Sequence, residues 1–258
     1  MNEEKRREEK RIPLMEIFGP TIQGEGSMIG LQTFFIRLGL CDYKCTMCDS
    51  MHAVDPRSVM VHGKRLTQEE ILAEFLEYTQ KKAGKASWVT LSGGNPAIHD
   101  LTVLVDGLQR AGYLVSVETQ GTFSPQWLTL CDFVTVSPKG PGMGERFELN
   151  KLTEMISLLR DSMAQHCIKI VVFDQRDLEF AVSICEEFED YRREGLIMLS
   201  LGNPFPPGKD NLTGLNLPEV LTERYKMLYE DISTHSILSQ LRFLPQWHVY
   251  LWGNQKGF

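Results

Sequence analysis

The chain has 258 residues, of which 42% are hydrophobic and 24% charged, so its composition is that of an ordinary globular protein large enough for one α/β core. Its 27 Lys and Arg against 34 Asp and Glu give a net charge of −7, which argues against broad contact with nucleic acid phosphates. No apolar run reaches the roughly 20 residues of a membrane helix, and no signal peptide is recognisable. We therefore expect a cytoplasmic protein that acts on neither nucleic acid nor a membrane.

The predicted elements begin after a charged tail at residues 1–12. Short apolar runs rich in Val, Ile and Phe predict buried strands at 33–37, 88–91, 114–117, 133–136, 168–173 and 196–201. Helices are expected after a capping box at residues 67–70 and at 100–111, 150–164, 177–189 and 217–233. Strands that alternate with helices predict a parallel sheet, and six strands are fewer than the eight of a closed TIM barrel. Residues 13–258 are thus expected to form a single α/β domain, a partial (open) TIM-like barrel of about six parallel strands with flanking helices.

Two loops rich in Pro and Gly follow predicted strands, at residues 137–144 and 203–214. In α/β sheets and barrels, ligands bind at the loops that follow the carboxyl ends of strands. Both loops are therefore candidate binding loops.

Three of the six cysteines lie within eight positions, directly after the strand at 33–37. Cys41, Cys45 and Cys48 have the spacing C-x3-C-x2-C. In a reducing compartment such clustering indicates metal binding rather than disulfides. A closed zinc site would need a fourth ligand, which His52 could supply, whereas a [4Fe–4S] cluster on three thiolates leaves one iron open to an external ligand. The remaining cysteines are scattered and are expected in the core: Cys131, Cys167 and Cys185.

The cysteine spacing is the signature of the radical S-adenosylmethionine superfamily, and further motifs match it in order. Residues 91–96 (LSGGNP) resemble the Gly-Gly-Glu-Pro motif, but Asn95 replaces Glu, which removes the charge from one cofactor hydrogen bond. Residues 117–122 (VETQGT) resemble Glu-Thr-Asn-Gly-Thr, and residues 137–139 (SPK) close the next strand. The segment 16–26 (EIFGPTIQGEG), with Arg37, resembles the 7-carboxy-7-deazaguanine synthases of that superfamily.

The resemblance implies a lyase of queuosine (7-deazapurine) biosynthesis. Such an enzyme converts 6-carboxy-5,6,7,8-tetrahydropterin to 7-carboxy-7-deazaguanine with loss of ammonia. The implied cofactors are a [4Fe–4S] cluster, S-adenosyl-L-methionine and Mg²⁺, and a 5′-deoxyadenosyl radical removes hydrogen from C6 before the ring contracts. An electron donor such as flavodoxin or ferredoxin and a homodimer are also implied. The alternatives are another radical S-adenosylmethionine enzyme, such as an activase, and a zinc-stabilised binding module.

The resemblance also assigns roles to individual residues. The implied metal ligands are Cys41, Cys45 and Cys48 for the cluster and Ser50 for magnesium. The implied substrate contacts are Ile22, Gln23, Gly24, Arg37, Ser92, Gln246 and His248. The implied cofactor contacts are Met47, Gly94, Asn95, Glu118, Ser137, Pro138 and Lys139. No side chain is expected to be catalytic, because the cofactor supplies the radical. Structural alternatives are a salt bridge for Arg37, a buried structural histidine for His248 and a helix cap for Ser50.

Overall fold

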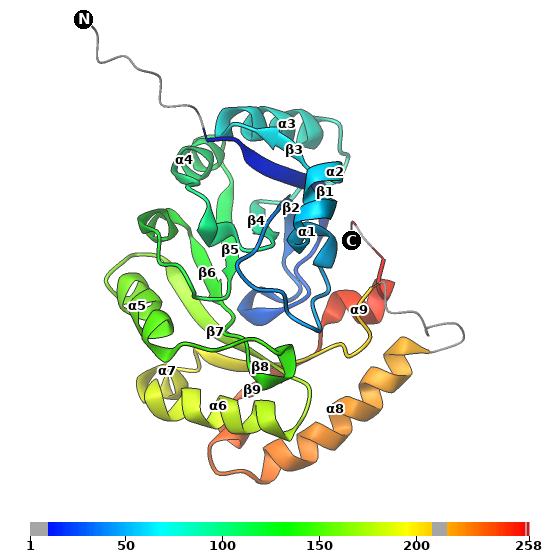
Figure 1. Cartoon of the computed structure of the whole chain (residues 1–258), viewed down its shortest axis with the longest axis vertical. Helices are drawn as coiled ribbons and strands as arrows, with labels where there is room; N and C mark the ends of the chain where they lie inside the picture. Colours follow the sequence, from blue (N-terminus) through cyan, green and yellow to red (C-terminus); the bar gives the residue numbers. More distant parts are fainter. Residues whose placement is uncertain (1–9, 208–215, 256, 258) are drawn as a thin grey trace, which may run out of the picture.

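The structure, a computed structural model, describes residues 10–207, 216–255 and 257. Its strands form one sheet in the order β3-β1-β2-β4-β5-β6-β7-β8-β9. Neighbours from β2 to β9 are parallel, whereas β1 pairs antiparallel with both β2 and β3. The edge strands β3 and β9 do not pair with each other within the described residues, so the sheet curls without closing (Figure 1). The predicted open barrel is confirmed.

All six predicted strands are present. They are β2 (Gln32–Leu38), β4 (Trp88–Gly93), β5 (Leu114–Thr119), β6 (Phe133–Val136), β7 (Gln165–Val172) and β8 (Ile197–Leu201). The structure adds β1 (Ile12–Ile22), β3 (Lys64–Leu66) and β9 (Arg242–Leu244), which we had not predicted. Proline and glycine argue against a strand, and β1 contains Gly19 and Pro20. The strand accommodates them because its pairing with β2 shifts register between Phe18 and Thr21.

The five predicted helices are also present, flanking the sheet. They are α3 (Gln68–Gln80), α4 (Thr102–Arg110), α5 (Leu149–Arg160), α6 (Gln175–Glu187) and α8 (Leu217–Thr234). The predicted capping box begins α3: the Glu70 amide donates to Thr67 Oγ1 at 3.2 Å, and the Thr67 amide donates to Glu70 Oε2 at 2.8 Å. Shorter helices were not predicted: α1 (Met51–Val54), α2 (Pro56–His62), α7 (Glu189–Arg193) and α9 (Trp247–Trp252).

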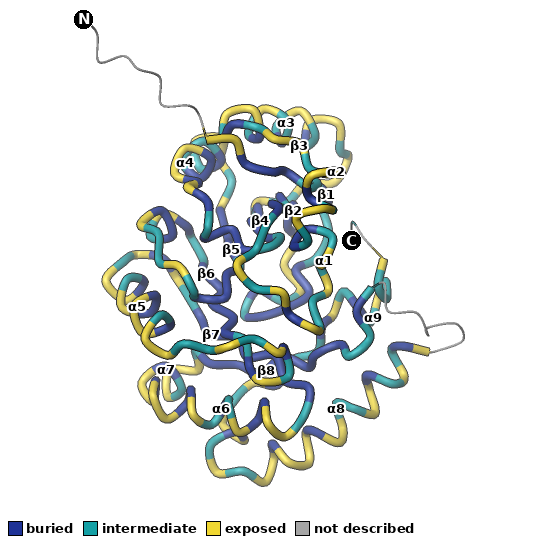
Figure 2. The backbone as a smooth tube through the Cα atoms, in the orientation of Figure 1, coloured by how far each residue is buried: buried dark blue, intermediate teal, exposed yellow. Residues whose placement is uncertain are grey.

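Buried residues of the strands alternate between an apolar outer face and a more polar inner face. Residues such as Leu91 and Val117 belong to the apolar core under the helices, which expose their outer sides (Figure 2). The strand residues that alternate with these apolar residues are often Ser or Thr. Their hydroxyls form hydrogen bonds between neighbouring strands, from Thr33 to Thr90 at 2.9 Å and from Thr90 to Ser116 at 2.8 Å. A sheet buried on both faces thus keeps a polar interior, which leads up to the carboxyl ends of the strands.

Some predictions fall partly outside the described residues, namely positions 1–9 of the tail and 208–214 of the second loop. Ile12, which we had assigned to the tail, is instead buried as the first residue of β1. The single domain at 13–258 stays a prediction. In the part of the chain that the structure describes, no helix is long and apolar enough to cross a membrane.

Candidate active site

A cavity of about 190 Å³ lies at the carboxyl ends of the parallel strands. Both predicted loops contribute to it, through Ser137 and Lys139 from one and Asn203 from the other. Most residues with a predicted role line it: Ile22, Gln23, Gly24, Arg37, Cys41, Cys45, Met47, Cys48, Ser50, Ser92, Gly94, Glu118, Ser137, Lys139, Gln246 and His248. Asn95 and Pro138 do not. The structure therefore brings together segments that are more than 200 residues apart in the sequence.

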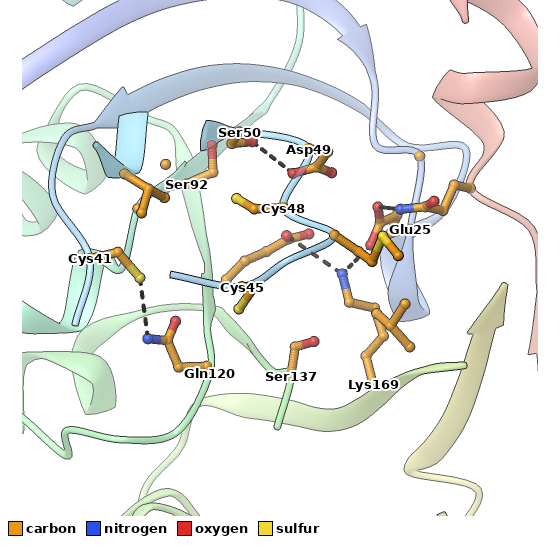
Figure 3. Close-up of a pocket in the computed structure, with 18 of the residues that line it drawn as sticks. Glu25, Cys41, Cys45, Cys48, Asp49, Ser50, Ser92, Gln120, Ser137 and Lys169 are labelled. Carbon is orange, nitrogen blue, oxygen red and sulfur yellow. Dashed lines mark hydrogen bonds and ion pairs between the residues drawn. The ribbon is translucent and has the colours of Figure 1, made fainter. Parts of the chain in front are cut away.

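The cysteine loop follows β2 and places all three thiols on this cavity (Figure 3). Cys41 Sγ accepts hydrogen bonds from the Tyr43 amide at 3.4 Å and from Gln120 Nε2 at 3.5 Å. Burial raises the pKa of all three thiols, to about 11 for Cys45 and about 12 for Cys48. The thiols are therefore protonated at neutral pH, and a metal group that binds them must displace these protons. Cys131, Cys167 and Cys185 are buried in the core, as predicted.

The ligands available beside the three thiols bear on the choice between zinc and a cluster. A tetrahedral zinc site needs a fourth protein ligand, and His52 does not line the cavity on which the thiols lie. The proposed fourth ligand, His52, instead has Nε2 3.3 Å from Glu16 Oε1. This donor set fits a cluster, whose thiolates bind different irons, better than one zinc ion.

The glycine pair at the end of β4, Gly93 and Gly94, holds the start of the cysteine loop. The Gly94 amide donates to the Leu38 carbonyl at 3.0 Å, and a Cβ on Gly94 would lie 1.8 Å from the Leu40 carbonyl oxygen. Gly93 has φ +129°, and a Cβ there would lie 1.9 Å from the Leu38 oxygen. In the structure, these glycines allow the backbone of the cysteine loop to approach.

Asn95 lies behind the cavity wall, with 1% of its surface exposed. Its Oδ1 accepts from Thr119 Oγ1 at 2.8 Å, and its Nδ2 donates to Asp42 Oδ1 at 2.9 Å. Gln120 Nε2 also donates to Asp42 Oδ1, at 2.7 Å. The amide of Asn95 thus joins the end of β5 to the cysteine loop instead of facing the cavity.

A buried charged group occupies the end of the cavity away from Cys41 (Figure 3). The Lys169 ammonium, on β7, bonds Glu25 Oε2 and lies 3.6 Å from Glu118 Oε2. Gln246 Nε2 donates to Glu25 Oε1 at 2.6 Å, and Gln23 Nε2 donates to Glu118 Oε1 at 3.0 Å. Burial opposes ionisation of both partners. The Lys169 and His248 charges nevertheless lower the pKa of Glu25, and the two carboxylates raise the pKa of Lys169.

Neither Lys169 nor Glu25 was predicted from the sequence to have a role in the site. A signal was available, because Lys169 interrupts the apolar run Ile168–Val172, and a lysine is almost never fully buried unless it is paired. Glu25 belongs to the segment on which the resemblance rested. The structure adds both residues to the candidate site.

Arg37 forms a salt bridge, which was the structural alternative, and it also lines the cavity, where a substrate contact was predicted. Its Nε donates to Glu16 Oε1 at 2.7 Å, and its guanidinium lies over the Phe18 ring at 5.2 Å. Its Nη1 donates to Ser50 Oγ at 3.0 Å, while Ser50 donates to Asp49 Oδ1 at 2.9 Å. Ser50 is the N-cap residue of α1 but makes no side-chain cap hydrogen bond. The cap reading of Ser50 is therefore wrong.

Ser92 is the penultimate residue of β4, and its hydroxyl lacks a hydrogen-bond partner among the described residues. Its Oγ is buried, yet the residue lines the cavity. Buried polar atoms in folded proteins are normally hydrogen-bonded. A polar ligand in the cavity would satisfy this hydroxyl.

No family model matches the chain. It is 37% identical to a 7-carboxy-7-deazaguanine synthase of Bacillus subtilis over 252 residues, which cover 96% of this chain and 99% of the relative. The corresponding Bacillus cereus synthase is 34% identical, over 96% of this chain and 99% of that protein. The chain belongs to the 7-carboxy-7-deazaguanine synthase family. The crystal structure of QueE from Escherichia coli is similar as well, with a TM-score of 0.59 and 25% identity over 92% of this chain and 95% of that one.

The two ends of the cavity are formed by different segments of the chain. The cysteine loop is at one end, and the segment 22–25 with Gln246 and His248 is at the other. The Trp247 amide donates to the Gly24 carbonyl at 2.8 Å, so the C-terminal segment packs directly on the N-terminal motif. The N-terminal motif is the segment on which the sequence resemblance to the family rested.

Proposed function

We propose that this family member converts 6-carboxy-5,6,7,8-tetrahydropterin to 7-carboxy-7-deazaguanine with loss of ammonia, in queuosine (7-deazapurine) biosynthesis. The observation that carries the proposal is a single cavity that has three cysteine thiols at one end and a buried group of amides, carboxylates and an ammonium at the other. The thiol end suits a redox cofactor. The polar end suits a small heterocycle with many hydrogen-bonding atoms.

Cys41, Cys45 and Cys48 would hold a [4Fe–4S] cluster whose fourth iron is open to S-adenosylmethionine. The chemistry supplied there is one-electron cleavage of the sulfonium, which yields a carbon-centred radical. Met47, Gly94, Ser137 and Lys139 line the same region and are proposed to contact S-adenosylmethionine. Asn95 and Pro138, which were also assigned to the cofactor, lie outside the cavity lining, so we propose that they support its walls.

The polar residues are proposed to orient the pterin and exclude water. Gln23 and Gln246 each donate one side-chain hydrogen bond to a carboxylate and accept one from a backbone amide, which fixes the orientation of their side chains. A carboxylate accepts at about four lone-pair positions, so Glu118 keeps acceptor capacity for N–H groups of a ligand. Ser92 offers its unpaired hydroxyl.

Arg37 is proposed to bind the substrate carboxylate. Its Nε and one Nη1 hydrogen are directed to Glu16 and Ser50, and a guanidinium has five N–H donors in a planar fork. The Glu16 carboxylate and the Phe18 ring hold this fork at the cavity wall. A planar fork suits a carboxylate better than a flexible ammonium would.

An anaerobic assay tests the proposed function. The protein, reconstituted with iron and sulfide, is given S-adenosylmethionine, dithionite and the carboxypterin. We expect 7-carboxy-7-deazaguanine and ammonia in equal amounts over many turnovers, with 5′-deoxyadenosine well below the amount of product. Cleavage of S-adenosylmethionine without this product would indicate another radical enzyme, such as an activase. A colourless protein with stoichiometric zinc would indicate a binding module.

Ser50 is proposed to bind Mg²⁺ together with the substrate carboxylate, since magnesium prefers oxygen ligands and binds through few protein groups. The neighbouring Asp49 carboxylate supports a cation here. We expect Ser50→Ala to lower turnover at least about tenfold, the scale on which altered metal-site residues act, and to reduce its stimulation by MgCl₂. Ser50→Thr should retain both, because it keeps the hydroxyl. Initial rates across a magnesium titration test this, and a normal magnesium response in Ser50→Ala would contradict it.

We further propose a cytoplasmic homodimer that receives electrons from flavodoxin or ferredoxin, as the family resemblance implies. All six cysteines are free thiols, which supports a reducing compartment.

A further inference from the structure

The loop at residues 140–146 is bonded directly to the cysteine loop. The amide and the hydroxyl of Thr46, which lies between two of the cysteines, both donate to the Met143 carbonyl at 2.9 Å. The Lys44 amide donates to Glu145 Oε1 at 2.6 Å. A third contact joins the same loops, because the Tyr43 hydroxyl donates to the Arg146 carbonyl at 2.8 Å, so the cysteine loop is fixed at three residues between its first and last thiols.

Apolar packing strengthens the same contact. Met143 and Cys45 belong to one small buried cluster with Val171 and Phe173, which is separate from the main core. The conformation of the loop at 140–146 thus affects both the backbone of the cysteine loop and the surroundings of one thiol.

A buried carboxylate holds this loop from the opposite side. Asp177, on α6, is fully buried; its Oδ1 accepts from the Gly142 amide at 2.8 Å and its Oδ2 accepts from the Phe173 amide at 2.9 Å. A Cβ on Gly142 would lie 2.3 Å from Asp177 Oδ2, so the loop backbone rests directly on the carboxylate. Asp177 does not line the cavity.

We propose that Asp177 is a positioning residue for the iron–sulfur cluster. It fixes Gly142, the adjacent Met143 fixes Thr46, and Thr46 holds the segment that carries Cys45 and Cys48. The inference rests on the cluster proposed above. Both carboxylate oxygens accept from backbone amides, so a side chain with only one acceptor cannot replace Asp177 without losing a bond.

The test compares Asp177→Asn with Asp174→Asn in anaerobically reconstituted protein. Asp174 precedes the same helix, but its half-exposed side chain bonds Arg176 and not the loop. We expect Asp177→Asn to release iron to a chelator roughly fivefold faster and to raise amide hydrogen exchange in the peptide 41–48 by a similar factor, the effect of one lost hydrogen bond on local opening. Asp174→Asn should match the wild type in both measurements, and exchange in β8 should not change in either variant.

Thr46→Val makes the test independent of how well Asp177→Asn folds, because it removes only the hydroxyl bond at the other end of the same contact. Since both variants act through Met143, their effects on exchange at 41–48 should be less than additive in the double variant. Wild-type exchange and iron release in Asp177→Asn, or strictly additive effects, would overturn the proposal. Hydrogen exchange can be measured without a cluster. If the wild type binds no cluster, the proposed cofactor is refuted, but the exchange comparison still tests the contact between the loop at 140–146 and the cysteine loop.

Discussion

Cys45→Ala is expected to yield a folded protein that retains little iron and cleaves no S-adenosylmethionine. Among the described residues, three thiols line the cavity, so the loss of Cys45 leaves a cluster with two protein thiolates. Cys41→Ala and Cys48→Ala should behave in the same way. The measurements are the iron content and visible absorption after reconstitution, and 5′-deoxyadenosine formation with dithionite.

Cys185→Ala is the matched control, because this thiol is buried in α6 as part of the main core. It should keep the full iron content and turnover, with only a loss of stability of the kind that a small cavity causes. Full S-adenosylmethionine cleavage by Cys45→Ala would refute the assignment of the cluster to these cysteines.

Lys169→Met is expected to destabilise the protein by about 3–5 kcal/mol at pH 7, the usual cost when one partner of a buried ion pair is removed. The side chain of Lys169 is 4% exposed, and it is the cation between Glu25 and Glu118. The change leaves these carboxylates without their partner in the interior of the barrel. Urea unfolding of the wild type and the variant measures the difference.

The pH dependence of this loss separates an electrostatic effect from a packing effect. In the wild type, Lys169 and His248 lower the pKa of Glu25 against the effect of burial. The ion pair of Glu25 with Lys169 therefore stabilises the fold at pH values above the unfolded pKa of about 4.3, and this stabilisation is lost as the pH falls below that value. Without Lys169, burial would raise the pKa of Glu25. Protonation of Glu25 at lower pH would then remove the unpaired buried charge that destabilises the variant. The difference in unfolding free energy between the wild type and Lys169→Met should therefore be smaller at pH 4 than at pH 7.

Two further variants complete this comparison. The double variant Glu25→Gln with Lys169→Met should recover part of the stability, because it buries no unpaired charge at that position. Lys226→Met, which removes an exposed lysine paired with Glu223 on α8, should show no measurable change. An equal loss for Lys169→Met at pH 4 and pH 7 would show that packing, and not charge, is responsible.

The parallel strands and the cysteine loop could be predicted because their signals are local. Val, Ile and Phe runs identify β2 and β4 to β8, and the loop is defined by residue identity and spacing alone. β1 could not be predicted in this way, because Gly19 and Pro20 are unfavourable in a strand and are tolerated only through an irregular pairing with β2. The partners that make such a pairing possible are not apparent from the segment itself.

The direction in which a polar side chain points could not be predicted from the sequence either. Asn95 occupies the motif position of a cofactor ligand, yet its amide is taken up by Thr119 and Asp42. Lys169 has its partner Glu25 144 residues away in the sequence, so neither residue alone indicates a buried ion pair. Hydrogen bonds between distant segments decide which polar groups face the cavity, and composition or periodicity does not record them.

The packing of the C-terminal segment on Gly24 and Glu25 has a consequence for the order in which the protein is made. The cysteine loop lies before residue 147, and so do the glycine pair and the loop at 140–146 that hold it. These segments therefore leave the ribosome early. The polar end of the cavity needs Gln246 and Trp247, which are synthesised more than 200 residues after their partners. Because contacts between distant segments form late in folding, a nascent chain would present its thiols before it has a complete substrate site. We therefore expect a cluster that is inserted during synthesis to be exposed to oxygen and water until the last helix docks.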